Sequence, residues 1–296
     1  MGQSADKKRT WTIGALIQWA REYLGRQGVD SPRLAGELLL AHALGLDRVQ
    51  LYLRYQQPLT PAELAGFKEL ILRARRQEPI AYILGKKEFW GLELLVGPGV
   101  LIPRPETEHL VEEGLKRLQE VAEPRVLDLC TGSGAVALAL AAERDELKAV
   151  AVDLSPQALD FARRNVAELG LEGRVELRRG HLFEPVAADG FFHLVTANPP
   201  YVSEAEWPKL PPAVREFEPR QALVAGPLGL ELAEQIIAGA PAHLRAGGWL
   251  LMELGQGQAA RARELAARSG AYEEIQIIND LAGIERVLAC QRSDYG

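Results

Sequence analysis

Short apolar runs alternate with helical segments from Arg125 onward, and this alternation constrains the fold more than any other feature. Five runs, at 125–129, 148–152, 174–177, 192–197 and 249–254, have the length and composition of buried strands. The segments between them have helical spacing, at 135–143, 156–169, about 229–243 and about 257–268. This order predicts a doubly wound α/β fold with a mostly parallel sheet. Two closing runs, 272–278 and 285–290, lack an intervening helix and predict an antiparallel edge hairpin, which makes the sheet seven-stranded.

The first part of the chain has a different pattern. Residues 11 to about 80 carry apolar residues at a spacing of three to four, which predicts helices throughout. Thr60 and Glu63 form a capping-box pattern, and Gly45 is a helix stop. From Gln77 to Val96 the chain becomes extended and aromatic-rich, with a predicted hairpin around Trp90. We therefore expect a small helical bundle over 1–80, a β-hairpin connector over 81–102 and an α/β domain over 103–296.

Composition excludes several classes of protein. No apolar run approaches the roughly 18 residues of a membrane span, and no apolar stretch follows the basic N-terminus, so we expect a cytoplasmic protein without a membrane partner. The cysteines Cys130 and Cys290 lack metal-ligand spacing and the five histidines are scattered, so no metal is expected. Residues 1–100 carry 14 Lys and Arg against 10 Asp and Glu, whereas the remainder carries 20 against 30. The two parts should therefore meet different partners.

A glycine loop follows the first strand of the α/β part. Residues 128–134 read Asp-Leu-Cys-Thr-Gly-Ser-Gly, and a helix with unpaired N–H groups follows them. With the next three residues the loop also satisfies a loose dinucleotide pattern, and Asp153 follows Gly132 by 21 residues, where an acid can hold ribose hydroxyls. A nicotinamide enzyme is therefore one interpretation. However, the Asp128 carboxylate is unfavourable beside a pyrophosphate and suits a cationic sulfonium better.

The tetrapeptide Asn198-Pro199-Pro200-Tyr201 ends the strand at 192–197. Two prolines remove two N–H donors, so the carbonyls before them are free to accept hydrogen bonds from a ligand. Taken alone, the tetrapeptide is a turn that ends a strand. Its place at the carboxyl edge of the sheet, with Gly132 and Asp153, instead favours methyl transfer to a planar amino or amide nitrogen.

At this point the chain resembles the S-adenosylmethionine-dependent methyltransferases and, more narrowly, the release-factor glutamine methyltransferases (PrmC/HemK). The resemblance rests on blocks that span nearly the whole chain, namely residues 78–85, 88–91, 101–108, 198–201, 218–220 and 280–283. The Asn-Pro-Pro-Tyr block also occurs in nucleic-acid N-methyltransferases. The blocks Pro-Arg-Pro-Glu-Thr-Glu and Glu-Phe-Trp-Gly are specific to the narrower family.

The resemblance implies a Rossmann-like methyltransferase domain, an N-terminal substrate-docking domain, and transfer of a methyl group to the N5 amide nitrogen of the glutamine in the Gly-Gly-Gln motif of release factors. S-adenosyl-L-homocysteine is then the product. It also implies roles for individual positions. The donor contacts would be Cys130, Thr131, Gly132, Ser133, Gly134, Asp153, Leu182 and Asn198. The substrate glutamine would lie against Leu101, Asn198, Pro199, Pro200 and Tyr201, with Asn198, Pro199 and Tyr201 as the catalytic residues.

Two positions depart from the family pattern. Cys130 stands where the family usually has glycine, and His181 stands where an aspartate is commoner. These departures keep open a non-catalytic binding protein with a degenerate donor site. A nucleic-acid adenine or guanine N-methyltransferase is the nearer alternative, but the acidic balance of residues 101–296 disfavours a nucleic-acid substrate. We interpret Glu218 and Arg220, in a proline-rich loop, as a lid pair or a surface ion pair.

Overall fold

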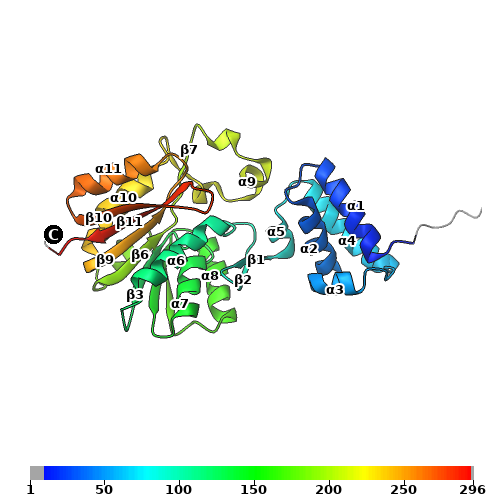
Figure 1. Ribbon diagram of the computed structural model, residues 1–296, viewed down its shortest axis with the longest axis horizontal. Coiled ribbons are helices and arrows are strands. Elements are labelled where there is room, and N and C mark those ends of the chain that lie inside the picture. The colour runs from blue at the N-terminus through cyan, green and yellow to red at the C-terminus, as the bar shows by residue number, and fades with distance from the viewer. Residues whose placement is uncertain (1–9, 295–296) are drawn as a thin grey trace, which may run out of the picture. The chain divides into compact units, whose positions relative to one another are not determined.

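The computed structural model describes residues 10–294 of the chain (Figure 1). The chain divides into two compact units, the first ending at Gly85 and the second beginning at Lys86. No helix in the described range is long and apolar enough to cross a membrane.

The first unit is a helical bundle, as the spacing of its apolar residues predicts. Its helices are α1 (Ile13–Arg26), α2 (Pro32–Leu44), α3 (Arg48–Leu53), α4 (Pro61–Arg75) and α5 (Ile80–Leu84). The Thr60–Glu63 capping box begins α4, and Gly45 ends α2 in the left-handed conformation, both as expected. The helices share one apolar core, built around residues such as Leu24, Leu39 and Phe67.

The expectation of an extended segment from 77 to 85 is wrong, because α5 lies there. Pro79 precedes the helix with a φ of −55°, Gly85 ends it with a φ of 75°, and Tyr82 and Ile83 are buried. Burial of these side chains outweighs their β propensity. The predicted hairpin follows, with β1 (Lys86–Phe89) antiparallel to β2 (Leu92–Leu95).

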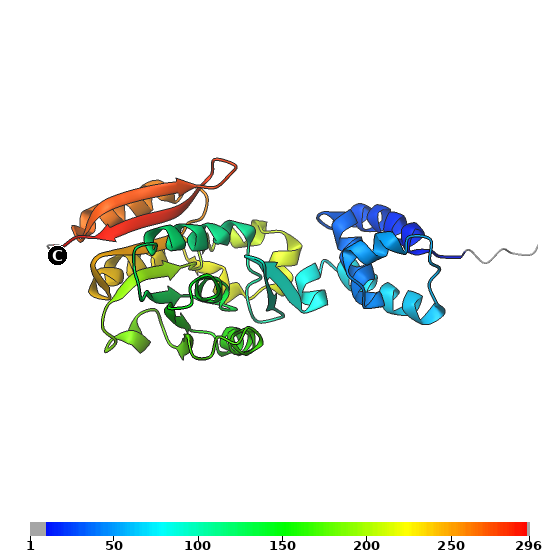
Figure 2. The ribbon, with the colours of Figure 1, turned by 60° about the horizontal axis from the view of Figure 1, so that its bottom comes forward.

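The second unit contains the predicted seven-stranded sheet. Its strands are β3 (Arg125–Leu129), β4 (Lys148–Asp153), β5 (Val175–Arg179), β6 (Phe192–Ala197), β9 (Leu244–Glu253), β10 (Tyr272–Asn279) and β11 (Glu285–Arg292). Their order is β10-β11-β9-β6-β3-β4-β5, and β11 runs antiparallel to both of its neighbours. The closing hairpin therefore lies at the sheet edge, where Figure 2 shows it. The carboxyl ends of β3, β4, β5, β6 and β9 meet along one edge.

Helices cover both faces of the sheet (Figure 1). One face packs against α6 (Glu108–Arg117), α7 (Ala135–Glu143) and α8 (Pro156–Glu168), and the other against α10 (Glu231–Gly239) and α11 (Ala259–Ser269). Neighbouring residues of β3 point to opposite faces. Val126 belongs to the core under α6, α7 and α8, and Leu127 belongs to the core under α10 and α11. Burial on both faces explains why the central strands are almost continuously apolar.

Shorter elements connect the main ones. A small parallel sheet, β7 (Val202–Ser203) with β8 (Val224–Gly226), brackets α9 (Pro212–Phe217) after the Asn198 tetrapeptide. The sequence patterns did not predict these three elements. Single 3₁₀ turns occur at Pro105–Thr107, Glu184–Val186, Trp207–Lys209, Arg220–Ala222 and Ala240–Ala242.

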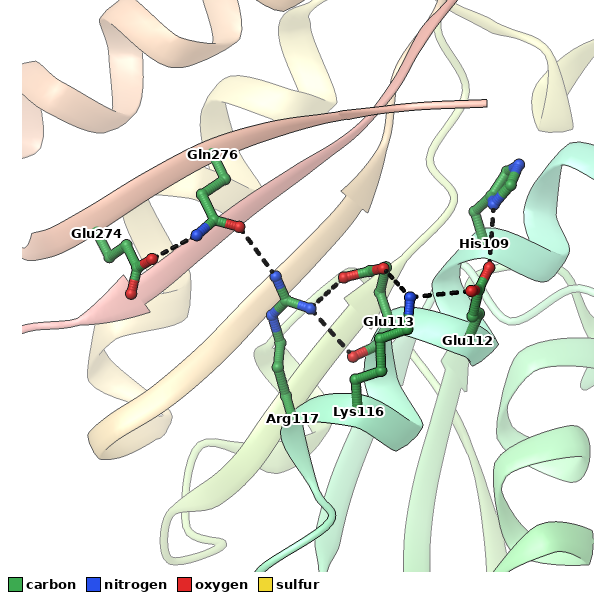
Figure 3. Close-up of polar contacts among 7 residues, drawn as sticks. All are labelled: His109, Glu112, Glu113, Lys116, Arg117, Glu274 and Gln276. Atoms are coloured by element: carbon green, nitrogen blue, oxygen red, sulfur yellow. Dashed lines mark hydrogen bonds and ion pairs between the residues drawn. The ribbon is translucent and has the colours of Figure 1, made fainter. Parts of the chain in front are cut away.

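A charged network joins α6 to the edge strand β10 (Figure 3). Arg117 pairs with Glu113 of its own helix, donates to Oε1 of Gln276 at 3.3 Å, and lies over the Trp249 ring at 4.4 Å. Lys116 extends the network along the helix, because its Nζ lies 2.9 Å from a carboxylate oxygen of both Glu112 and Glu113. These contacts hold α6 against the closing hairpin.

Candidate active site

A cavity of about 400 Å³ opens at the carboxyl edge of the sheet, a volume in the range of small-molecule sites. Its walls come from the loops after β3, β4, β5 and β6, from residues 99–107 and 219–225, and from the first turns of the three helices that begin at Ala135, Pro156 and Glu231. The part of the chain that the structure describes contributes Asp128, Asp153 and Glu231 to the lining but no Lys or Arg. Such a lining suits a cationic ligand and disfavours a pyrophosphate, which needs compensating positive charge or donors.

The Asp153 carboxylate joins two loops of the donor end. Oδ2 accepts a hydrogen bond from the backbone N–H of Gly132 at 2.8 Å, and Oδ1 accepts one from Ser155 at 2.8 Å. Burial raises the pKa of Asp153, while these backbone donors oppose the rise. The carboxylate therefore holds the glycine loop beside the turn that begins α8.

The glycine loop adopts left-handed backbone at three positions. The φ angles are 56° at Cys130, 59° at Gly132 and 87° at Gly134. Cys130 therefore takes the conformation in which a glycine is unstrained, at a cost of about 1–2 kcal/mol. Burial raises the pKa of the Cys130 thiol, which keeps it protonated and unreactive. The loop forms with cysteine at this position, so the departure from the family pattern does not remove the turn.

The buried Asp128 side chain stabilises the glycine loop through hydrogen bonds. Its carboxylate accepts hydrogen bonds from the hydroxyls of Thr131 at 2.5 Å and Thr196 at 2.7 Å. Burial raises the pKa of Asp128 to about 6, so the group is charged at neutral pH. A negative charge therefore lies close to the cavity wall between β3 and β6.

The loop also contains one orphaned polar atom. Oγ of Ser133 is buried and has no hydrogen-bond partner among the described residues. The backbone carbonyl of Ser133, in contrast, accepts a hydrogen bond from Nδ2 of Asn165 in α8 at 2.9 Å. The Asn165 amide also pairs with the N–H and C=O of Leu95, at 2.7 and 3.1 Å, and so ties the hairpin to the loop. An unpartnered hydroxyl at the cavity wall fits a ligand that offers a polar group there.

A relay of two hydrogen bonds in series, from Asn198 to Thr107 and from Thr107 to Glu253, holds the Asn198 side chain. Its Nδ2 donates to Oγ1 of Thr107 at 3.0 Å, and that hydroxyl donates to Oε2 of Glu253 at 2.6 Å. Asn198 and Thr107 both line the cavity. Thr107 lies within the Pro-Arg-Pro-Glu-Thr-Glu block, and Glu253 is the last residue of β9, but sequence reasoning assigned neither a role. An acid at the end of a buried strand was the signal that could have indicated Glu253.

Gln258 holds the end of the tetrapeptide. Its Nε2 donates to the carbonyl of Tyr201 at 2.9 Å and to that of Gly229 at 3.0 Å. Burial raises the pKa of the Tyr201 phenol to about 12, with Glu253 adding to the rise, so the ring stays neutral.

Glu218 corrects the interpretation of the proline-rich loop. Its buried carboxylate accepts from Nη2 of Arg104 at 2.5 Å and from the N–H of Ile102 at 3.2 Å, not from Arg220. Arg220 instead lies 3.9 Å from Glu204 at the surface. Both expected readings, a Glu218–Arg220 lid pair and a surface ion pair, are therefore wrong. Glu218 ties residues 102–104 to the far wall of the cavity, because Pro219 beside it is a lining residue.

Most of the predicted site residues meet around this one cavity. Its lining includes Leu101, Cys130, Thr131, Gly132, Ser133, Asp153, Leu182, Asn198 and Pro200, together with His181. Three predicted residues are not part of the lining, namely Gly134, Pro199 and Tyr201. Gly134 instead precedes α7, where an added Cβ would lie 2.9 Å from Leu138. Pro199 and Tyr201 lie next to lining residues within the tetrapeptide.

Two solved structures with a similar fold are methyltransferases. A 16S rRNA methyltransferase of T. thermophilus, in complex with AdoMet and guanosine, is 19% identical, with a TM-score of 0.52 over 70% of this chain and 49% of that one. A methyltransferase from Pyrococcus furiosus has a TM-score of 0.50 and is 19% identical over 76% of this chain and 98% of that one. These similarities show that the second unit has a Rossmann-like fold of the kind found in methyltransferases.

Sequence comparison narrows this class. Residues 15–85 match the profile of the PrmC N-terminal domain, and residues 109–210 match that of the methyltransferase small domain. A release factor glutamine methyltransferase from Geobacter sulfurreducens is 44% identical over 96% of this chain and 98% of its own length. Another, from Rhodopirellula baltica, is 41% identical over 96% and 97%. The chain belongs to the release factor glutamine methyltransferase family, whose cofactor is S-adenosylmethionine.

The Asp153 contacts lead to a prediction about donor affinity. Asp153→Asn keeps the shape of the side chain but turns one acceptor oxygen into a donor, which must face the N–H of Gly132 or Ser155. We expect S-adenosylmethionine to bind about 10- to 100-fold more weakly, measured by calorimetry. Asp145→Asn is the matched control, because the Asp145 side chain is 93% exposed. Equal donor affinity in the wild type and Asp153→Asn would contradict this role.

Proposed function

We propose that this protein transfers the methyl group of S-adenosylmethionine to the N5 amide nitrogen of the glutamine in the Gly-Gly-Gln motif of peptide-chain release factors. The observation that carries the proposal is the Asn198 side chain, which lines the cavity while its NH₂ group is engaged by Thr107. Its carbonyl oxygen is thereby left to accept a hydrogen bond from a planar nitrogen. The names of the relatives that match nearly the whole chain support the same substrate.

The donor end of the cavity offers what S-adenosylmethionine requires. Asp153 and the buried Asp128 place negative charge near a cationic ligand, and the orphaned Ser133 hydroxyl offers a polar contact. Residues 130–134 would surround the methionine part, Asp153 the ribose and Leu182 the adenine. His181 lines the same end, so it can contact the adenine in place of the commoner aspartate. The donor supplies an electrophilic methyl group on a sulfonium.

The acceptor end has to activate a poor nucleophile. An amide nitrogen shares its lone pair with its carbonyl, so catalysis requires orientation and withdrawal of the two N–H protons toward acceptors. Oδ1 of Asn198 and the carbonyl of Pro199 would accept those two hydrogens. They would hold the nitrogen in line with the methyl group and stabilise the positive charge that develops on it. Once the new bond forms, the nitrogen is acidic and its proton leaves to water, so no strong base is needed.

Apolar residues would complete the glutamine pocket. Leu101 and Pro200 line the cavity, and Tyr201 lies beside them with a neutral ring that can pack over the amide plane and exclude water. The cavity offers no Lys or Arg from residues 10–294 to a phosphate backbone. This supports a protein substrate over a nucleic acid. We also propose that the enzyme is cytoplasmic and acts on translation factors without a membrane partner.

The experiment that tests the function is mass spectrometry of a release factor incubated with the enzyme and S-adenosylmethionine. We expect a gain of about 14 Da on the glutamine of the Gly-Gly-Gln peptide, together with S-adenosyl-L-homocysteine as the product. A glutamine-to-alanine release factor is the control substrate. Methylation of DNA or RNA with an unmodified release factor would overturn the proposal, and absence of donor binding would favour a non-catalytic protein.

Asn198→Ala tests the catalytic assignment. Removing an oriented acceptor at the reacting nitrogen should lower kcat by about 10²-fold or more while leaving the donor Kd nearly unchanged. Methylation kinetics and calorimetry on the same preparation measure the two quantities. Parallel losses of donor affinity and rate would show that Asn198 serves the donor and not the acceptor.

We further propose that the first unit docks the release factor, with the docking surface on α3 and the turn after it. Val49, Tyr52, Leu53 and Tyr55 are all large, apolar or aromatic, and exposed. Beside them, the half-exposed Arg48 and Arg33 both pair with the buried Glu37, which leaves a net positive charge, so this surface suits an acidic protein with apolar side chains. The net positive charge of residues 1–100, beside the net negative charge of residues 101–296, agrees with a first unit that binds an acidic partner.

Leu53→Glu tests this docking surface. The Leu53 side chain is among the most exposed apolar groups, at 80%, and a carboxylate there should raise KM for an intact release factor by about 10-fold. KM for a short Gly-Gly-Gln peptide should not change, because the peptide reaches only the cavity. Leu72→Glu, at a 39% exposed leucine of α4, is the matched control. An equal rise in KM for peptide and factor would contradict the docking role.

A further inference from the structure

The Thr107 hydroxyl sets the direction of a buried hydrogen-bond relay. A hydroxyl carries a single proton, and an ionised carboxylate can only accept. Because Thr107 donates to Glu253 at 2.6 Å, it has no proton left for Asn198 and can only accept from it. Asn198 must therefore turn its NH₂ group toward Thr107, as the 3.0 Å contact from Nδ2 shows.

The opposite end of the Asn198 amide is the one that remains for a ligand. Oδ1 accepts no hydrogen bond from any residue in the range 10–294, and Asn198 lines the cavity. The reverse orientation would place the NH₂ group there instead. A substrate amide presents its own NH₂ group to this position. In the reverse orientation two NH₂ groups would face each other, and because both are donors they could form no hydrogen bond.

We propose that the negative charge of Glu253 selects which end of the Asn198 amide faces the substrate, which makes Glu253 a positioning residue for methyl transfer. The inference rests on the proposed function. When Glu253 takes up a proton, it can donate to Thr107. The Thr107 hydroxyl is then free to donate to Oδ1 of Asn198, and this contact turns the NH₂ group of Asn198 toward the substrate. Glu253 itself touches neither substrate nor donor.

The surroundings of Glu253 allow this change near neutral pH. The side chain is 3% exposed at the end of β9, and burial raises its pKa to about 7. The Thr107 hydrogen bond opposes the rise. Glu106 adds to it, whereas the positive charges of Arg286 on β11 and Arg104 lower the pKa. The Tyr201 phenol also faces this group but stays neutral. Glu253 is therefore an anion above about pH 7 and neutral below it.

The dependence of kcat on pH tests the proposal. For the wild type at saturating donor, kcat should fall as the pH drops through about 7. Glu253→Gln has no charge at any pH, so kcat should be flat between about pH 6 and 9 and roughly 10-fold below the wild-type plateau. Thr107→Val should also abolish the fall, because it removes the relay. Thr107→Ser keeps the hydroxyl and should keep the pH dependence.

A second variant changes the titration without touching the relay. Glu106→Gln removes a negative neighbour that raises the pKa of Glu253, so the midpoint of the kcat profile should move to lower pH by roughly half a unit. A purely structural role for Glu253 would not produce this shift. The kcat profile of Glu106→Gln also tests the proposal if the Glu253→Gln enzyme folds poorly.

Two results would overturn the inference. One is a Glu253→Gln enzyme that keeps the wild-type fall in kcat below pH 7, and the other is an unmoved midpoint in Glu106→Gln. Failure of the proposed function gives a different result, because the wild type would then methylate no Gly-Gly-Gln glutamine even at about pH 8, where Glu253 is charged.

Discussion

Buried side-chain hydrogen bonds hold residues 95–107 across the carboxyl edge of the sheet, and both ends of the site depend on this segment. Asn165 pairs with both backbone groups of Leu95, Glu218 accepts from Ile102 and Arg104, and Thr107 connects Asn198 to Glu253. Between these anchors lie Val100 and Leu101, which line the cavity. A segment without regular secondary structure over most of its length thus becomes a fixed wall of the cavity.

The site concentrates negative charge that burial disfavours. Asp128, Asp153 and Glu253 all have pKa values raised mainly by burial, and hydrogen bonds from hydroxyl or backbone donors oppose that rise in each case. Cys130 adds backbone strain in the same loop, with a φ of 56°. Such departures from the most stable arrangement are expected where binding or catalysis requires them. In the binding mode that we propose, Asp128 and Asp153 lie near the cationic donor, and the Asn198 amide oxygen faces the substrate nitrogen.

Much of this could be predicted from the sequence, for identifiable reasons. Most of the central strands are apolar and flanked by helices with clear periodicity, so the mostly parallel seven-stranded sheet and its antiparallel edge hairpin were predicted correctly. The rule that ligands bind at the carboxyl ends of parallel strands then placed Gly132, Asp153 and Asn198 together. Helix α5 was missed because a five-residue element is too short to show a period, and β7, α9 and β8 were missed for the same reason.

The amino-acid sequence alone determined the sheet, the donor loop and the family, because periodicity and local motifs are properties of neighbouring residues. Only the tertiary structure decided the partners of the buried polar groups. Glu218 meets Arg104, 114 positions earlier, and Glu253 meets Thr107, 146 positions earlier. Contacts across such separations depend on how β9 and the loops come together at one edge, which no local pattern encodes. The orientation of the Asn198 amide, on which the proposed chemistry depends, is therefore a product of the fold.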